Sequence, residues 1–188
     1  MLVVGLMSGT SLDGIDASLV EIEGFGEATK INVIKSISLP FDIAIKEELL
    51  NIMDIHTSNV EQICSMNYKI SYLFADAVKE VCKQAHVPLE ELDLIGSHGQ
   101  TIYHIPQAAP PLVNSTLQIG DPAVIAYETN TLVVSNFRAM DMAAGGEGAP
   151  LIPYIDWLLF KSRAKGRILQ NIGGIGNCTV LKRNGMKD

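Results

Sequence analysis

Two glycines near the start of the chain have the spacing found in a phosphate-binding loop. The stretch VVGLMSGTSLDGIDASLV (residues 3–20) places Gly9 and Gly14 in a turn between two apolar, β-prone runs. This is the glycine spacing of the nucleotide-binding P-loop, whose backbone N–H groups hold phosphate oxygens. Where that motif needs a lysine and a hydroxyl residue, this chain has Ile15 and Asp16. The turn can therefore donate to a phosphate but brings no positive charge of its own.

The other side chains of the turn suggest how that charge is supplied. Ser8, Thr10 and Ser11 add hydroxyl donors, while Asp13 and Asp16 add carboxylates. Either carboxylate could hold a divalent cation, directly or through water, and the cation would neutralise the phosphates. The alternative is a tight hairpin whose aspartates only hydrogen-bond to their own backbone.

A second polar cluster follows an apolar strand in the stretch LDLIGSHGQT. Ser97, His98, Gln100 and Thr101 come at the carboxyl end of this strand, where open α/β sheets bind ligands. Such a cluster suits hydrogen bonding to a hydroxylated molecule. His98 could instead be a histidine that only packs within the loop. The sequence lacks G-x-S-x-G, so a hydrolase nucleophile elbow is not supported.

Two further motifs lie in the last third of the chain. NFRAMDMAAGGEGAPL combines Arg138, a candidate anion clamp, with Asp141, a candidate general base. The alternative for this pair is a surface ion pair. NIGGIGN, with Gly173 and Gly174, could form a second phosphate turn facing the first, although any glycine hairpin looks similar.

Elements that position these motifs can be predicted from periodicity and caps. Strands are expected at 3–6, 15–22 and 31–39, and helices at 43–53 and from a Ser58–Glu61 capping box to Ala85. A crossover then leads to the strand of LDLIGSHGQT. The Pro-rich residues 106–111 should form a surface loop. A strand and a helix capped by Asp121 and Pro122 should follow.

The remaining elements are expected to be a strand reaching residues 136–138, a glycine-rich loop over 141–150, and a helix over 150–160. The hairpin of RILQNIGGIGNCTVL repeats the opening design, which indicates a duplicated architecture. We therefore expect a first lobe with the phosphate loop at 1–130. Residues 131–188 would then hold a connecting catalytic segment and the first strands of an incomplete second lobe.

Composition excludes several classes of protein. The 188 residues are 47% hydrophobic and 19% charged, an ordinary globular balance, and the net charge of −7 argues mildly against nucleic-acid binding. Cys64, Cys82 and Cys178 are far apart and form no C-x-x-C pair, which favours a reducing cytoplasm. No run of about 18 apolar residues occurs, so we expect no contact with a membrane.

Five stretches together resemble the anhydro-N-acetylmuramic acid kinase family, within the actin, hexokinase and Hsp70 superfold. They are GLMSGTSLDGID, GSHGQT, LQIGDPAVIA, NFRAMDMAAGGEGAPL and NIGGIGN, in the family's order over nearly the whole chain. The resemblance implies an α/β fold, with a ribonuclease H-like mixed sheet and flanking helices forming the first lobe of a two-lobed sugar kinase or actin-like ATPase. The family usually has glutamine where Glu147 stands, which is a local departure.

The resemblance also implies an ATP-dependent reaction on 1,6-anhydro-N-acetylmuramic acid, a product of cell-wall turnover. Water opens the anhydro ring while the freed 6-oxygen takes the γ-phosphoryl group, giving N-acetylmuramic acid 6-phosphate and ADP. Asp141 would be the base that activates the water, and Asp13 would bind Mg²⁺. The sugar would lie near Ser97, His98, Gln100 and Arg138. The ATP phosphates would be held by Gly9, Thr10, Ser11, Leu12, Asp13, Gly14, Ile15, Asp16, Gly173 and Gly174.

Members of this family are about twice as long as this chain. The missing half would complete the second lobe and its adenosine pocket, so we expect the 188-residue chain not to turn over substrate alone. Apolar surface meant for that half would be exposed, which favours self-association, for example as a homodimer. Two other functions stay open: a nucleotide- or partner-binding half-module without catalysis, and a sugar hydrolase that uses Asp141 without ATP.

Overall fold

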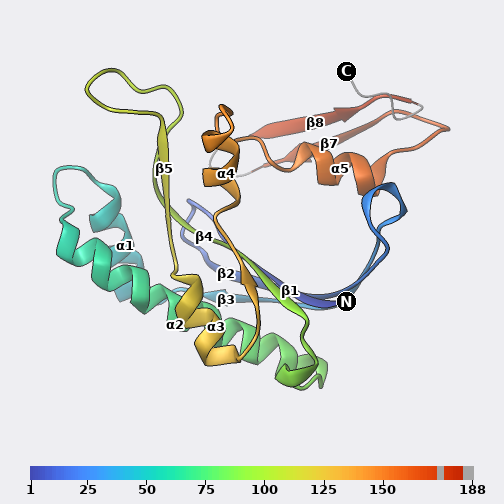
Figure 1. Cartoon of the computed structure of the whole chain (residues 1–188), viewed down its shortest axis with the longest axis horizontal. Coiled ribbons are helices and arrows are strands. Elements are labelled where there is room, and N and C mark those ends of the chain that lie inside the picture. Colours follow the sequence, from blue (N-terminus) through green and yellow to red (C-terminus); the bar gives the residue numbers. More distant parts are fainter. Residues whose placement is uncertain (173–175, 184–188) are drawn as a thin grey trace.

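A six-stranded mixed sheet forms the centre of the chain in the computed structural model, which describes residues 1–172 and 176–183 (Figure 1). Its strands are β1 (Leu2–Ser8), β2 (Gly14–Glu23), β3 (Lys30–Pro40), β4 (Leu94–Ile105), β5 (Ser115–Ile119) and β6 (Val133–Val134). The first three form an antiparallel meander, and β4 joins β1 in parallel. The order is β3-β2-β1-β4-β5, and β6 also pairs in parallel with β4. This arrangement confirms the α/β class and the mixed sheet.

Helices lie on both sides of this sheet, and most begin where the sequence predicts. They are α1 (Ile43–Met53), α2 (Val60–Ala85), α3 (Pro122–Thr129), α4 (Phe137–Ala143) and α5 (Pro153–Phe160), with short 3-10 turns η1 (Gly26–Ala28) and η2 (Leu89–Glu91). α2 and α3 pack beneath the sheet, while α4 stands on its other side (Figure 1). None of the helices within the described residues has an apolar run that would cross a bilayer.

Side-chain caps explain where α1, α2 and α3 start. Asp121 accepts a hydrogen bond from the Ala123 amide at 2.9 Å, and Pro122 occupies the first turn of α3, as predicted. For α2, the predicted capping box is wrong by one residue. Asn59, and not Ser58, is the N-cap, because its side chain accepts from the Gln62 amide at 2.9 Å.

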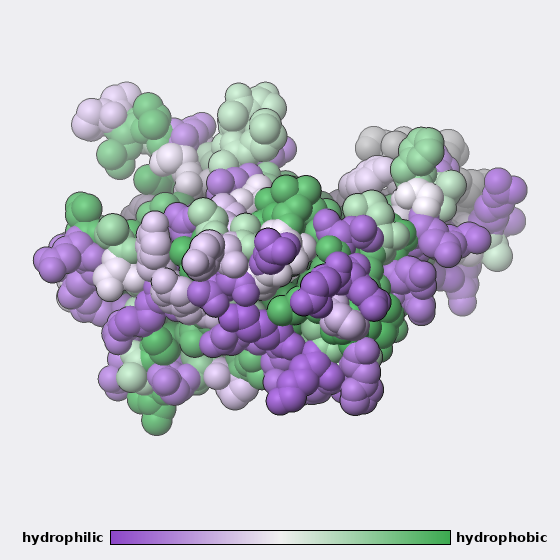
Figure 2. Space-filling view, turned by 60° about the horizontal axis from the view of Figure 1, so that its bottom comes forward, coloured by the Kyte–Doolittle hydropathy of each residue, from purple (hydrophilic) through white to green (hydrophobic). Residues whose placement is uncertain are grey.

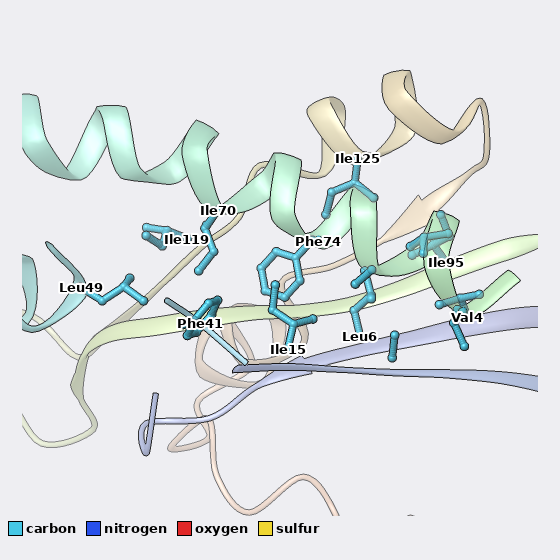
Figure 3. Close-up of a cluster of buried hydrophobic side chains, with 14 of the residues drawn as sticks. Val4, Leu6, Ile15, Phe41, Leu49, Ile70, Phe74, Ile95, Ile119 and Ile125 are labelled. Carbon is cyan, nitrogen blue, oxygen red and sulfur yellow. The ribbon is translucent and has the colours of Figure 1, made fainter. Parts of the chain in front are cut away.

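The core lies between α2 and the meander. Leu6 of β1 and Ile15 of β2 lie next to Phe74 of α2, Val4 lies farther along the sheet, and Ile125 of α3 closes the same cluster (Figure 3). All five side chains are buried. The outer surface of α2 is mostly hydrophilic, so the helix is amphipathic as its periodicity predicts (Figure 2). Burial of these side chains fixes which face of the sheet is left to carry a site.

The structure corrects one part of the predicted order of elements. The strand expected to reach Arg138 is only two residues long, and the stretch that begins at Phe137 is the helix α4. Met, Ala and Arg favour a helix over this stretch, and the glycines begin only at Gly145. Arg138 and Asp141 therefore stand one turn apart on a helix, and not on a strand end and a loop.

The last part of the chain forms a separate hairpin. β7 (Arg167–Asn171) and β8 (Asn177–Leu181) pair as a two-stranded antiparallel sheet, as predicted. Thr179 Oγ1 donates to Asp156 Oδ2 of α5 at 2.6 Å, and Lys161 Nζ lies 2.9 Å from Glu27 Oε2 beside η1. The division into a lobe at 1–130 and an incomplete second lobe at 131–188 stays a prediction.

Candidate functional site

A buried leucine anchors the turn between β1 and β2. Leu12 is 3% exposed and has a positive φ of 55°, so its side chain enters the core while the backbone bends sharply. Its amide donates to the Gly9 carbonyl at 3.2 Å, which closes the turn. A positive φ at leucine costs about 1 kcal/mol. Thr10 and Ser11, between these two residues, are exposed, and their hydroxyls are available to a ligand.

Packing places different demands on the two glycines of the turn. At Gly14, an added Cβ would lie 2.7 Å from Pro40 Cα and 2.8 Å from the Leu39 carbonyl carbon, so the backbone of β3 excludes any side chain. At Gly9, an added Cβ would meet only Ser11 Oγ, at an ordinary 3.6 Å. Packing within the chain therefore explains Gly14 but not Gly9. A glycine that no contact within the described residues requires is consistent with a loop that a ligand approaches from outside.

The acidic side chains of the turn have partners that come from elsewhere in the chain. Asp13 Oδ1 lies 3.9 Å from Lys46 Nζ of α1, and the Asp13 side chain is 83% exposed. Asp16 Oδ1 accepts from Ser38 Oγ of β3 at 2.5 Å. Sequence reasoning missed Lys46, because its approach depends on how α1 packs. This lysine is a positive charge beside the loop that the loop itself lacks.

These carboxylates fit a magnesium ion only in part. Among the described residues, no three His, Cys, Asp or Glu side chains gather as a metal cluster. Mg²⁺ usually takes one or two carboxylates, while water and substrate phosphates supply the other ligands. The exposed Asp13 suits such a role, whereas Asp16 is already engaged by Ser38.

The GSHGQT residues do not lie at the carboxyl end of a strand, as the sequence predicted, because β4 continues past them to Ile105. A bulge within β4 decides where their side chains lie. Leu6 pairs with Ser97, but Ser8, two residues further, pairs with Gln100, three residues further. The extra residue falls at Gly99, which has a φ of +72°, and an added Cβ there would lie 2.6 Å from the Ile119 carbonyl oxygen. The bulge therefore requires glycine, and it changes the direction in which the side chains on either side of it point.

The side chains on either side of this bulge have different surroundings. Ser97 is 1% exposed, and its Oγ is the single buried side-chain polar atom without a partner in the described part of the chain. Gln100 is fully buried beneath the first turn and contacts Ser8 and Gly9. His98 is half-buried and reaches α4. A role of these three residues in binding sugar stays a prediction.

His98 and Arg138 form a contact that fixes the charge of the histidine. Arg138 Nε donates to His98 Nε2 at 2.8 Å, and His98 Nδ1 lies 2.9 Å from the Gly99 carbonyl. Nε2 must accept and Nδ1 must donate, so these contacts assign the neutral Nδ1–H form. Burial lowers the pKa of His98, and the positive charge of Arg138 lowers that pKa further. Burial also lowers the pKa of Arg138.

The backbone of Gly148 connects Arg138 to Asp141 through two hydrogen bonds. Its N–H donates to Asp141 Oδ2 at 2.8 Å, and its carbonyl accepts from an Arg138 terminal nitrogen at 2.7 Å. The predicted alternative, a direct ion pair between the two side chains, does not occur among the described residues, where each instead binds the glycine loop. An added Cβ at Gly146 would lie 2.6 Å from Asp141 Cγ. The loop therefore closes around the carboxylate and holds its orientation.

The rest of the glycine loop is anchored on the β4–β5 hairpin. Gln107 Nε2 donates to Glu147 Oε1 at 3.0 Å, and an added Cβ at Gly148 would lie 3.3 Å from His104 Cε1. Gly173 and Gly174, predicted to form a second phosphate turn, lie outside the described residues. The chain thus brings Asp141, Arg138 and His98 together on one side of β4, while Gln100 connects the same strand to the first turn.

Comparisons with known proteins agree with the motifs. A family model described as "Anhydro-N-acetylmuramic acid kinase" matches residues 1–187. A curated protein of that name from Bacillus cereus is 58% identical over 188 residues, covering 100% of this chain and 48% of its own length. One from Bacillus thuringiensis subsp. konkukian is 60% identical over 181 residues, covering 96% and 47%.

The chain spans about half the length of the curated relatives it matches. Among solved structures, RuvC of Thermus thermophilus is similar with a TM-score of 0.33 and 11% identity, over 84% of this chain and 77% of that one. A likeness of that degree decides nothing about fold or function.

Proposed function

Because the chain belongs to the anhydro-N-acetylmuramic acid kinase family, we propose that it is one lobe of an ATP-dependent sugar kinase. The complete protein would open 1,6-anhydro-N-acetylmuramic acid with water and phosphorylate it to N-acetylmuramic acid 6-phosphate. It would act in the cytoplasm, where ATP is available, on a sugar released by cell-wall turnover. The 188 residues alone would be inactive, because they span about half the length of the curated relatives and the lobe that closes over the substrates would lie in the other half.

The observation that carries this proposal is the position of the end of β1 beside the bulge of β4. β1 and β4 are parallel neighbours, with Ser8 opposite Gln100. The phosphate-type turn that follows β1 therefore begins beside the segment that carries His98 and, through it, Arg138. Ligands of open α/β sheets bind at the carboxyl ends of strands, and β1 ends at this point. A nucleotide bound at this end and a sugar bound beside the bulge of β4 would be close enough to react with one another.

The phosphates of ATP would be bound at the turn of residues 9–16. The Thr10 and Ser11 hydroxyls and the backbone amides around Gly9 would donate to phosphate oxygens. Asp13 would hold Mg²⁺, which neutralises phosphate charge, and Lys46 would add a second positive charge. The residues Leu12, Gly14, Ile15 and Asp16 would shape this turn, and Gly173 and Gly174 would complete the phosphate site.

Asp141 would act as the general base in ring opening. Its carboxylate would take a proton from water while the water oxygen bonds to the anomeric carbon. The bond from that carbon to the 6-oxygen breaks, and the 6-oxygen bonds to the γ-phosphorus as the bridge to ADP breaks. Gly148 N–H at 2.8 Å would keep Asp141 oriented, and Arg138 and His98 would contact the sugar together with Ser97.

The scheme can be tested with the full-length protein in heavy-oxygen water. Mass spectrometry should find one heavy oxygen at the anomeric position and a phosphate on the 6-oxygen. Product added ready-made to the same water measures how much label enters later by exchange. Incorporation of heavy oxygen no greater than in this exchange control would contradict the kinase scheme. Ring opening without ATP would also contradict it and would favour the hydrolase.

Asp141→Asn should abolish ring opening and phosphorylation together, because one step depends on the other. General base catalysis contributes about 100-fold to 10,000-fold, so loss of at least 100-fold is expected. Glu147→Gln is the matched control, since Glu147 is an exposed acid in the same loop whose partner Gln107 can also bind glutamine. If ring opening persisted in Asp141→Asn, the base would be another residue.

A comparison of Mg-ATP binding by the 188-residue chain and by the full-length protein tests the half-module alternative. Tight binding by the short chain alone would favour a nucleotide-binding module. We expect weak binding to the short chain, because the adenosine pocket would come from the second lobe.

A further inference from the structure

Gln100 lies in the GSHGQT segment, but its side chain turns away from the open side of the sheet. It is fully buried, with no exposed surface, beneath the turn that follows β1. The bulge at Gly99 puts Gln100, instead of Gly99, opposite Ser8 on the neighbouring strand. A ladder without the bulge would pair Ser8 with a residue that has no side chain. The bulge therefore supplies an amide side chain at this point.

Hydrogen bonds occupy both ends of the Gln100 amide. Oε1 accepts from Ser8 Oγ at 2.6 Å. Nε2 donates to the carbonyls of Gly9, at 3.3 Å, and Thr101, at 3.2 Å. An amide nitrogen has two hydrogens, so no donor is left for a ligand. The side chain is thus engaged by the chain itself, and two of its three partners belong to the start of the turn.

These bonds set the direction of the peptide between Gly9 and Thr10. The Gly9 carbonyl accepts from Gln100 Nε2 and, at 3.2 Å, from the Leu12 amide. Both donors hold this oxygen toward the interior. A trans peptide is planar, and its N–H points opposite to its carbonyl. The Thr10 N–H is therefore aimed outward, beside the one glycine of the turn that internal packing does not require.

Ser8 extends the same contact to the far end of the turn. Its Oγ lies 2.6 Å from Gln100 Oε1 and 3.0 Å from the Gly14 carbonyl. One buried hydroxyl thus connects β4 with both the entry and the exit of the turn. Loss of the Gln100 amide would leave the Gly9 and Thr101 carbonyls and the Ser8 hydroxyl without this buried partner. Because unpaired buried polar groups are unfavourable, we expect the backbone of the turn to shift toward other hydrogen-bond partners.

We propose that Gln100 is a positioning residue, which aims the Thr10 N–H at a phosphate group of the nucleotide and does not contact the sugar. The proposal rests on the proposed function for the identity of the anion. It assigns the GSHGQT segment two tasks on opposite sides of its bulge: His98 faces α4, and Gln100 supports the phosphate turn from below. The substitution that tests it is Gln100→Met, which keeps the side-chain length and removes both hydrogen-bonding ends.

Steady-state kinetics of the full-length protein separate this role from sugar binding. Gln100→Met should raise the KM for ATP at least tenfold and change the KM for the anhydro sugar less than twofold. Gln118→Met is the matched control, because Gln118 of β5 is a partly buried glutamine that bonds Thr116 and Thr101 and not the turn. A raised sugar KM with an unchanged ATP KM would overturn the proposal and make Gln100 a sugar ligand.

Hydrogen exchange provides a measurement that does not depend on the reaction. The Leu12 amide, which shares the Gly9 carbonyl with Gln100, should exchange at least tenfold faster in Gln100→Met, while α2 amides stay unchanged. Equal exchange at Leu12 would overturn the proposal even if the enzyme proved not to be a kinase. If wild type transferred no phosphate, the proposed function alone would fail, because exchange would still report on the turn.

Ser8→Ala is the second variant if Gln100→Met does not fold. It removes the hydroxyl on Gln100 Oε1 and leaves the amide of Gln100 in place. The ATP KM should then rise threefold or more, with the sugar KM unchanged. Ser71→Ala is its control, because Ser71 is an equally buried serine that bonds only within α2. An ATP KM equal to that of wild type would count against the positioning role.

Discussion

Gly146→Ala should strongly reduce activity, because the added methyl group would displace the neighbouring Asp141 carboxylate. An added Cβ at Gly146 would lie 2.6 Å from Asp141 Cγ and 2.8 Å from Oδ1. No positive φ stands in the way of alanine here, in contrast to Gly145 and Gly148. The clash with Asp141 is therefore the main effect of the substitution, and the backbone can keep its conformation.

The size of the effect follows from these distances. Contacts of a Cβ become ordinary at 3.4 Å, so the Asp141 carboxyl carbon must retreat by roughly 1 Å. That retreat also loosens the 2.8 Å bond from Gly148 N–H to Oδ2. A misplacement of about 1 Å in a reacting group can cost about 100-fold in rate. In free energy of activation this is about 2.7 kcal/mol.

The assay is phosphoryl transfer by the full-length protein at saturating substrates. We expect kcat to fall about 100-fold, with both KM values nearly unchanged, because the displaced group acts on the water and not on binding. Gly145→Ala is the control in the same loop: its Cβ meets nothing within 4 Å, although its φ of +93° strains alanine. It should lose stability and keep most of kcat. A folded Gly146→Ala enzyme with kcat within threefold of wild type would refute the link between this loop and Asp141.

Two further predictions concern charge. Because the pKa of His98 lies below its ordinary 6.5 in the folded chain, the unfolded chain binds the proton first as pH falls. The free energy of unfolding, measured by urea denaturation, should therefore decrease below about pH 6.5, and it should decrease less in His98→Gln. The same pH dependence of this free energy in wild type and His98→Gln would contradict the prediction. Lys46→Met should weaken Mg-ATP binding about threefold to fivefold, as expected for one exposed charge contact of up to about 1 kcal/mol. Lys69→Met, which breaks an exposed pair with Glu48, is its calorimetric control, and equal affinities would exclude Lys46 from the phosphate site.

Local patterns in the sequence predicted most of the elements. The helix over 43–53 and the helix capped by Asp121 begin where they were expected, because their caps and apolar spacing are short-range signals. The stretch around Arg138 was predicted wrongly, because two valines favour a strand and three later glycines favour a loop. The helix α4 between them has helix-forming residues but no side-chain cap at Asn136 to mark its start.

The sequence also predicted which polar residues lie near one another, but not the direction in which their side chains point. It placed the SHGQT polar residues at the end of one strand, which is wrong, because β4 continues past them to Ile105 and they lie at a bulge within it. It could not separate His98 from Gln100, because the bulge between them appears only when β4 pairs with β1. It also missed Lys46, which approaches Asp13 from a different element.

Sequence by itself determined the family, the α/β class and the elements that carry the motifs, since periodicity, caps and motif spacing act over a few residues. Tertiary structure decided the roles within the site. Gly14 is required by the backbone of β3, Gln100 is directed inward by a bulge, and Asp141 is held by a loop that follows it. The physical reason is that hydrogen-bond partners and close contacts between distant segments exist only once the sheet has fixed their register.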